Sequence, residues 1–335
     1  MRATLQPIAF LSVCILVIGI PVATQGQTPR SESILFVSNH EELPRGNGLY
    51  LMTPLGSQLR RFLPDISGVA APRWSPDGSE IVLTMWSEGG GWSRVRVMDS
   101  DGGNLRLLSP NPGGSWAPTW APDGLRVAFS ERFDGMGEVF VGDTRGGNPQ
   151  LVGLRIDGFN ASLPSAGPTW SPDGTRIAFT AYKHNNEQSA RYIWTMKPDG
   201  SDKQALVTHE SLNISPAYSP DGSTIAFASD RDGPSEIYTI RADGTGLRRI
   251  TATEDAHRPR WSPDGTQIVF QRGPLFGQGV REIHVIESNG RNPQRLTDFG
   301  GRAWYPDWFD PTFSVSPAMR QVLAWGWLKQ LGSSR

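Results

Sequence analysis

Five aspartates occupy the same point of a recurring motif, and they are the most prominent residues in the chain that could do chemistry. Each lies in the pattern Pro-x-aromatic-(Ser/Ala)-Pro-Asp-Gly, and they are Asp77, Asp123, Asp173, Asp221 and Asp264. Carboxylates gathered at one point could share a proton or hold a metal ion. Copies spaced by 43 to 50 residues belong to separate structural units, however. We therefore interpret them as turn residues, and we predict no catalytic and no metal site from them.

The chemistry of the motif itself predicts a hairpin tip. Proline presets φ for the second position of a type I turn, and aspartate tolerates the third position while its carboxylate accepts local N–H groups. Glycine supplies the left-handed residue that closes such a hairpin. An apolar strand follows each copy, and these strands are Ile81–Thr84, Val127–Ser130, Ile177–Thr180, Ile225–Ala228 and Ile268–Gln271.

The motif marks a repeat that decides the fold class. The aromatic residue of each copy is Trp74, Trp120, Trp170, Tyr218 and Trp261, with a degenerate sixth copy at Trp308. After each hairpin come a third strand, a second tight turn such as Asp243-Gly244, and a short fourth strand. A period in the forties with four strands in each unit is typical of a propeller blade. We predict an all-β, six-bladed β-propeller with four antiparallel strands per blade.

The two ends of the repeat region complement each other. Ile34–Val37 matches a second strand but has no aromatic first strand before it, whereas Trp304–Phe309 is a first strand with nothing regular after it. We predict that the C-terminal strand joins the N-terminal blade as its innermost strand. Closure of this kind removes the open sheet edges that would otherwise pair with other chains.

The repeated Trp-Ser-Pro-Asp-Gly unit, followed by residues such as Ile177-Ala178-Phe179, resembles the repeat of TolB-like propellers and of the related prolyl oligopeptidase propellers. The resemblance covers residues 34–311 and implies the six-bladed fold, but it does not fix a function, because propellers have many roles. TolB carries an α/β domain before its propeller. We expect that domain to be absent here, since about ten residues separate the predicted signal segment from Ile34. No G-x-S-x-G motif of a hydrolase occurs in the sequence.

The N-terminal segment is predicted to direct export. Met1–Arg2 gives a positive start, and Ile8–Ile20 is an apolar run, shorter than the roughly 20 residues that a membrane helix needs. We interpret residues 1–26 as a signal peptide, with an uncleaved anchor as the alternative. The mature chain would then be secreted or periplasmic, without a transmembrane span. It would also lack cysteine, because Cys14 lies inside the apolar run.

The C-terminal tail, residues 312–335, is unusually apolar for an end segment. Trp325 and Trp327 are too large to leave in water without a reason. We predict a hairpin that packs on the propeller. The alternative is a peptide that docks on a partner.

A candidate binding site follows from the segments that lead into the innermost strands, since these converge on the central funnel. They are predicted to bring together Trp116, His257, Arg258, Trp304 and Tyr305. Aromatic rings beside a guanidinium could bind a peptide carboxylate, a sugar or a loop of a partner. The alternative is that these side chains only fill the channel. Among the other histidines, we interpret His284 as a packing residue in an aromatic slot, and we place His209 in the loop after a fourth strand.

The charge balance excludes one class of function. The chain has 32 basic and 33 acidic residues and a formal net charge of −1, which gives no reason to bind nucleic acid or anionic lipid. We expect a non-enzymatic binding or scaffolding protein without cofactors. Its protein partner would contact the funnel mouth or the rim loops Met85–Arg94, Tyr182–Arg191 and Arg272–Arg281.

One enzymatic alternative remains open. The blade repeat also resembles that of oligogalacturonate lyases, which implies a glycan- or uronate-acting enzyme. Those enzymes need several metal-binding side chains that converge on the funnel. In this sequence only His257 is well placed for that role, and one ligand does not make a metal site.

Overall fold

The computed structural model describes most of the chain from residue 31 to residue 312. The described ranges are 31–39, 47–87, 91–109, 111, 113–133, 136–145, 148–153, 160–161, 167–184, 189–253, 255–275 and 279–312. The predicted signal peptide and all but the first residue of the predicted tail lie outside these ranges. The ranges contain no helix whose length and hydropathy would let it span a lipid bilayer.

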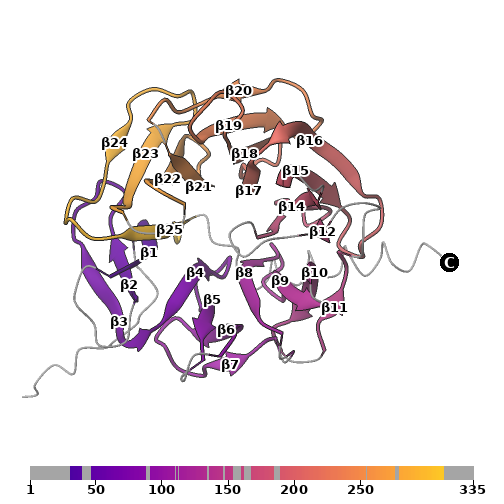
Figure 1. Ribbon diagram of the computed structural model, residues 1–335. Helices are drawn as coiled ribbons and strands as arrows, with labels where there is room; N and C mark the ends of the chain where they lie inside the picture. Colours follow the sequence, from indigo (N-terminus) through magenta and orange to yellow (C-terminus); the bar gives the residue numbers. More distant parts are fainter. Residues whose placement is uncertain are drawn as a thin grey trace, which may run out of the picture.

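The strands form six antiparallel sheets in a ring around one axis, with the innermost strands nearest the centre (Figure 1). Blade 1 consists of β25 (Ala303–Phe309), β1 (Ser33–Ser38), β2 (Gly48–Met52) and β3 (Arg60–Ser67). Blade 2 consists of β4 (Val69–Trp74), β5 (Glu80–Trp86), β6 (Ser93–Asp99) and β7 (Arg106–Leu107). Blade 3 consists of β8 (Ser115–Trp120), β9 (Arg126–Phe133), β10 (Met136–Asp143) and β11 (Gln150–Leu151).

Blades 4 to 6 complete the ring. Blade 4 consists of β12 (Asn160–Ala161), β13 (Thr169–Trp170), β14 (Ile177–His184), β15 (Ser189–Met196) and β16 (Gln204–Ser211). Blade 5 consists of β17 (Asn213–Tyr218), β18 (Thr224–Ser229), β19 (Glu236–Arg241) and β20 (Arg248–Arg249). Blade 6 consists of β21 (Ala256–Trp261), β22 (Gln267–Arg272), β23 (Glu282–Glu287) and β24 (Gln294–Arg295). The predicted fold class is confirmed.

The ring closes as the sequence predicts. Strand β25 pairs antiparallel with β1, so that Ser33 lies opposite Phe309 and Ser38 lies opposite Ala303. The last strand of the chain is therefore the innermost strand of the first blade. Each of the six sheets has a neighbour on both sides, which leaves the innermost edges facing the axis rather than another molecule.

The predicted turn chemistry is visible in every complete motif. In blade 4 the Thr175 N–H donates to Asp173 Oδ1 at 3.0 Å, and the Ser171 hydroxyl donates to the same oxygen at 2.6 Å. The glycine that follows, Gly174, has φ of 70°, a left-handed value that a residue with a Cβ rarely adopts. The five aspartates thus hold separate hairpins, as their interpretation as turn residues predicts.

The hydrophobic core is divided among the blade interfaces rather than gathered at one centre. Six clusters of buried side chains lie between successive blades, and each contains residues of two neighbouring blades. Within a blade, rings of the second and third strands pack together, as with Phe36 and Tyr50 at 5.8 Å between centroids. His284 takes the same position against Phe270 at 5.7 Å, which confirms its interpretation as a packing residue.

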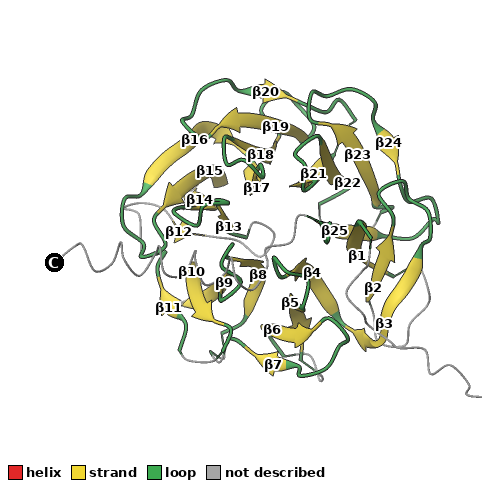
Figure 2. Cartoon of the chain, turned by 180° about the vertical axis from the view of Figure 1, so that it is seen from behind, coloured by secondary structure: helices red, strands yellow, loops and turns green. Residues whose placement is uncertain are grey.

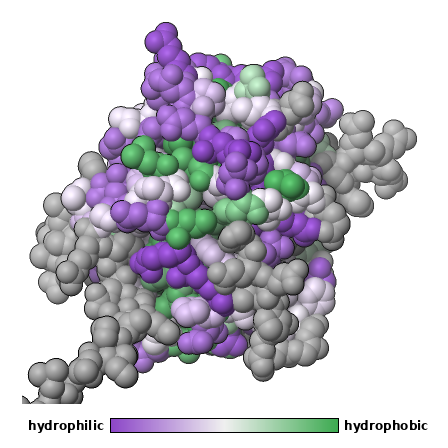
Figure 3. All heavy atoms as spheres, turned by 90° about the vertical axis from the view of Figure 1, so that its left-hand side faces the viewer, coloured by the Kyte–Doolittle hydropathy of each residue, from purple (hydrophilic) through white to green (hydrophobic). Residues whose placement is uncertain are grey.

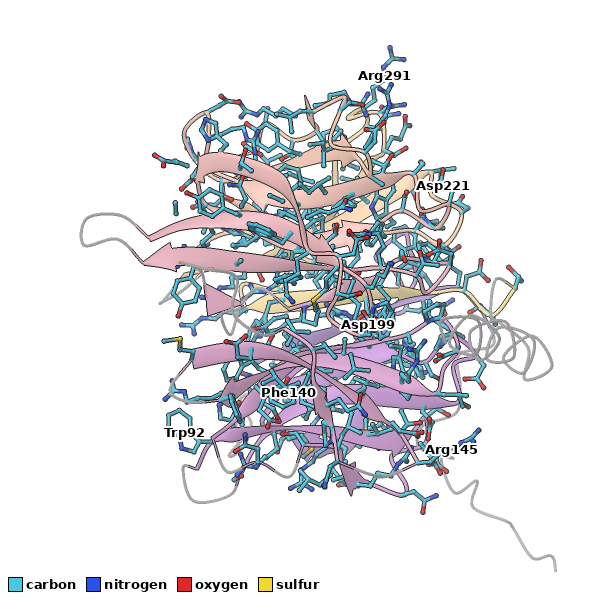
Figure 4. The ribbon with its side chains drawn as sticks, turned by 90° about the vertical axis from the view of Figure 1, so that its right-hand side faces the viewer. Trp92, Phe140, Arg145, Asp199, Asp221 and Arg291 are labelled. Atoms are coloured by element: carbon cyan, nitrogen blue, oxygen red, sulfur yellow. The ribbon has the colours of Figure 1, made fainter. Side chains whose placement is uncertain are left out.

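The two ends of the ring differ in their connections. We call the end with the Ser-Pro-Asp-Gly turns the turn face, and the end with the loops between second and third strands the hairpin face. In Figure 4 Asp221, Arg145 and Arg291 lie toward the turn face on the right, and Trp92 lies at the hairpin face on the left. Seen from the side opposite to that in Figure 1, the ring again consists of strands joined by loops (Figure 2). The outer wall near β3 and β24 mixes apolar side chains with polar ones (Figure 3).

Two details differ from the sequence analysis. The innermost position of blade 4 is shared by two short strands, because part of the long connection before Gly167 pairs with β14 through Asn160 and Ala161. The placement of His209 in a loop was wrong, because the fourth strand of that blade extends to Ser211 and includes it. In both cases β14 and β15 are eight-residue strands, long enough to pair with additional residues.

Candidate functional site

The innermost strands share one backbone feature that shapes the channel along the axis. Five of them contain a β-bulge, and the bulge includes a residue with a left-handed φ. These residues are Ala71, Ala117, Ser215, Arg258 and Tyr305, with φ between 47° and 57°. Bulges re-aim side chains and often occur next to functional sites. Here they place one residue of each blade against the axis, and with Gly167 of blade 4 we call this set the bulge ring.

Two residues further along each strand lies a second set, which we call the turn-side ring. Its members are Arg73, Thr119, Thr169, Ala217, Arg260 and Asp307. They line a cavity of about 310 Å³ that we call the turn funnel. The repeated aromatic residues Trp74, Trp120, Trp170, Tyr218, Trp261 and Trp308 also line it. Most of each of these rings is buried between blades, and the indole N–H groups of Trp120 and Trp261 donate to carbonyls of the preceding blade.

The charged members of the turn-side ring, Arg73, Arg260 and Asp307, come from three neighbouring blades, 2, 6 and 1. Asp307 accepts a hydrogen bond from the Trp74 N–H at 2.9 Å, and its Oδ1 lies 3.6 Å from Arg73 Nε. Burial raises the pKa of Asp307, while Arg73 and the Trp74 N–H oppose that rise. Arg260 donates to the Pro259 carbonyl at 2.7 Å, and burial together with the neighbouring Arg73 lowers its pKa well below the usual value. The positive charges here are thus held in a poorly solvated place.

The bulge ring contains the third arginine of the channel. Arg258 donates to Gln271 Oε1 at 2.7 Å and to the Tyr305 hydroxyl at 3.3 Å, and its guanidinium lies 4.2 Å from the centre of the Tyr305 ring. The cavity at this level is about 20 Å³, which is room for about one water molecule. The channel is therefore narrowest where these side chains meet.

The other sequence-predicted residues lie nearer the hairpin face and are not all in contact. His257 is buried, and its Nδ1 lies 3.2 Å from the Ser235 hydroxyl. Burial, with smaller effects from two nearby arginines, lowers the pKa of His257 to about 4, so the ring is neutral at pH 7. It borders a groove of about 840 Å³ that extends over blades 4, 5 and 6, and that is also lined by Arg191, His209, Asp230, Arg231 and Asp255.

The two tryptophans of the prediction are largely buried. Trp304 belongs to the core cluster between blades 1 and 2, and the Arg281 guanidinium lies 5.8 Å from its ring centre. Trp116 lies in the innermost strand of blade 3 opposite Ser130. The structure therefore joins Arg258 and Tyr305 directly, and it places His257, Trp304 and Trp116 at separate points around the hairpin-side mouth. Their role in binding stays a prediction.

A feature that the sequence analysis did not single out lies on the rim of the hairpin face. Three large aromatic side chains, Trp86, Trp92 and Phe133, are 49%, 53% and 47% exposed. Arg132 lies over one of them, with its guanidinium 4.5 Å from the Trp92 ring centre, and it precedes Phe133 in β9. We call these four residues the hairpin patch. The loop Met85–Arg94 was predicted as a contact region, but Phe133 gave no signal, because exposure at a strand end cannot be read from residue type.

The hairpin patch lies at the junction of blades 2 and 3. A Cβ placed on Gly114, at the start of blade 3, would lie 3.2 Å from the Trp92 Cβ, so this side chain lies directly against the backbone of the next blade. Phe133 packs edge-on against Phe140 at 6.1 Å. The rings of Trp92 and Phe133 are thus held by their neighbours, with about half of each side chain left in contact with solvent.

The described ranges contain no group of three or more His, Cys, Asp or Glu side chains that could hold a metal ion. The arrangement of residues along the axis supplies hydrogen-bond donors, positive charge and aromatic side chains. It defines the domain as a closed six-bladed β-propeller with an arginine-lined axis.

Comparisons with known proteins agree with this architecture. Residues 155–298 match the family model described as "TolB beta propeller domain". The Tol-Pal system protein TolB of Anaeromyxobacter dehalogenans is 33% identical over 123 residues, which are 37% of this chain and 25% of that protein. This chain thus aligns with about a quarter of the length of that curated relative.

Two solved structures share the fold. TolB from Acinetobacter baumannii has a TM-score of 0.66 and 20% identity, over 83% of this chain and 66% of that one. A putative TolB from Agrobacterium tumefaciens has a TM-score of 0.59 and 23% identity, over 83% of this chain and 98% of that one. Together with the repeat and the closed ring, these matches show that the domain is similar to the β-propeller of TolB.

Proposed function

We propose that the protein is an exported, non-enzymatic binding module that docks a protein partner on its hairpin face. The observation that supports this most directly is the hairpin patch. Exposed tryptophan and phenylalanine beside arginine are the residue types that dominate the energy of protein–protein contacts. A rigid β scaffold that presents them loses little conformational entropy on binding.

The proposal of export rests on the apolar segment Ile8–Ile20 and on the relatives. Those relatives are named for the Tol-Pal system. From these relatives we infer a location in the cell envelope and a protein partner, but we do not infer which protein that partner is.

The hairpin-side mouth of the channel is the proposed second contact area. Trp304 lies there with Arg281 next to its ring, and Arg258 and Tyr305 lie at the constriction of the channel beyond it. A partner loop that carries a carboxylate would meet cations and aromatic faces at this point. His257 and Trp116 would then shape the mouth without direct contact.

The test is capture of a partner from envelope extracts of the source organism by the full-length protein, with the W92A/F133A double variant alongside. We expect a protein retained by the wild type to be lost with this variant. Leu55, 82% exposed in the turn between β2 and β3, provides the matched control, because L55A removes an apolar side chain from the turn face. Equal retention by the wild type and W92A/F133A would contradict docking on the hairpin face.

A further inference from the structure

We propose that the turn funnel binds an oxyanion, a carboxylate or a phosphate group, between Arg73 and Arg260. The site lies on the turn face, at the opposite end of the channel from the proposed partner surface. It therefore stands or falls independently of the hairpin patch.

The first observation is an excess of positive charge. Within the two axial rings, Arg73, Arg258 and Arg260 supply three positive charges and Asp307 supplies one negative charge, which leaves two positive charges without balance. Arginine stays protonated in proteins. Buried charges are normally paired because desolvation is costly, so an unbalanced cluster in a cavity favours an anion.

The second observation is which arginines lack a partner. Arg73 has Asp307 beside it, at 3.6 Å. Among the residues that the structure describes, no carboxylate lies within 4.0 Å of the guanidinium of Arg258 or of Arg260. In addition, the buried Nε of Arg258 has no hydrogen-bond acceptor there. Arg260 borders the turn funnel directly, so its remaining N–H groups are available to an anion inside.

The third observation is the shape and lining of the cavity. Opposite the arginines, Thr119 and Thr169 add hydroxyl groups that can donate to an oxyanion, and Ala217 leaves space beside them. A cavity of about 310 Å³ is at the lower end of the range for ligand sites. It fits a small anion or one side chain rather than a large ligand.

Asp307 does not turn the funnel into a cation site. One of its oxygens already accepts the Trp74 N–H, and the other faces Arg73. The carboxylate fixes Arg73 in place, and a ligand would bind to the Arg260 side of the ring. A substitution of Asp307 that removes the negative charge but keeps an acceptor oxygen should therefore strengthen anion binding.

The test is isothermal titration of the full-length protein with inorganic phosphate and with succinate, at low ionic strength. We expect saturable binding of at least one of them, weakened by about tenfold or more in R260Q, since charge-assisted hydrogen bonds are the strong ones. D307N, whose amide oxygen can still accept the Trp74 N–H, should bind several times more tightly than the wild type. T169V keeps the side-chain volume and should bind more weakly by a few fold.

The matched control is R291Q. Arg291 is an exposed arginine on the same face, in the second turn of blade 6 and away from the funnel (Figure 4). Its removal changes the net charge as R260Q does and should leave binding unchanged. Equal weakening by R260Q and R291Q would overturn the proposal, as would unchanged affinity in D307N. If R260Q fails to fold, the comparison of D307N with the wild type tests the proposal.

A third titration separates the source of the anion. A short peptide with one central aspartate and blocked termini is compared with its asparagine counterpart. Tighter binding of the aspartate peptide than of succinate identifies a partner's side chain as the ligand, whereas tighter binding of phosphate or succinate identifies a free anion. Either result supports an oxyanion site, and failure of all three probes refutes it.

Discussion

Neighbouring positions of the innermost strands follow opposite rules. The aromatic residue before each turn is Trp74, Trp120, Trp170, Tyr218, Trp261 or Trp308, so its type hardly changes around the ring. The residue just before it, in the turn-side ring, changes from arginine to threonine, alanine and aspartate. The aromatic ring packs between two blades, whereas its neighbour faces the axis. Positions whose side chains pack between blades keep nearly the same residue type in every repeat. Positions that face the axis differ between blades, and they carry the polar and charged groups that are particular to this protein.

The largest expected effect tests this division at one pair of residues in blade 3. Trp120 is buried between blades 2 and 3 and donates its indole N–H to the Arg73 carbonyl at 3.1 Å. We expect W120A to lower the free energy of unfolding by about 3–5 kcal/mol, because it removes a large buried side chain. Its neighbour Thr119 faces the funnel, and T119A should change stability by less than about 0.5 kcal/mol.

Urea unfolding followed by tryptophan fluorescence measures both variants. F129A is a reference for the loss of another fully buried ring in the same cluster. The division of roles would be broken if T119A destabilised the protein as much as W120A does.

How much of the fold and of the candidate site could be predicted from the sequence depends on how far apart the interacting residues are in the chain. The Ser-Pro-Asp-Gly hairpins follow from contacts between residues two apart, such as Asp173 with Thr175, so they were predictable. The turn-side ring was not, because Asp307 and Arg73 meet only through ring closure across 234 positions of the sequence. The sixth copy of the motif is degenerate, so nothing in it marked Asp307 as a partner for an arginine.

The hairpin-side mouth shows a second limit. Alternation along a strand does not reveal a β-bulge, yet the bulge at Arg258, with φ of 53°, decides where the side chains of this strand point. It places Arg258 against Tyr305, while His257 contacts Ser235 in the preceding blade. Of the five residues predicted to converge, the structure brings Arg258 and Tyr305 together and leaves His257, Trp304 and Trp116 at separate points around the mouth.

The second prediction concerns His257, a position that differs between blades. Burial lowers its pKa in the folded protein to about 4, against the ordinary histidine value of 6.5. Between these pH values the unfolded chain binds a proton that the folded protein does not, so stability falls as the pH decreases from 6.5 to 4. We expect a loss of at most about 3 kcal/mol from this residue.

The measurement is the urea midpoint at pH 7 and at pH 4.5 for the wild type, H257Q and H209Q. H257Q should lose less stability on acidification than the wild type, and H209Q, which changes an exposed histidine, should behave like the wild type. Identical pH profiles for H257Q and H209Q would show that His257 is not a buried neutral ring. The mouth would then be more open to water than its packing indicates.

The smallest effect belongs to the repeated turn aspartates and tests whether equivalent positions really act alike. Burial raises the pKa of Asp173 and Asp264, but hydrogen bonds from the neighbouring serine and threonine hydroxyls and backbone N–H groups outweigh it. They lower the pKa of Asp173, Asp221 and Asp264 from the ordinary value of 3.8. Their stabilisation is therefore complete above pH 3.8 and is lost as the pH falls through the folded-state values. Because these carboxylates are largely solvated, each should contribute less than about 1 kcal/mol.

Single variants D173N, D221N and D264N, compared with the wild type by thermal unfolding at pH 7 and at pH 3, measure this effect. We expect three small and similar losses at pH 7 that become smaller at pH 3, because the carboxylates of the unfolded chain are largely protonated there and their stabilising effect declines as the pH falls. A large loss at one turn alone would mean that its aspartate has a task beyond the hairpin. Three equal losses would instead show that a repeated residue repeats its energetic role, so that the unequal residues of the turn-side ring are the ones to examine for binding.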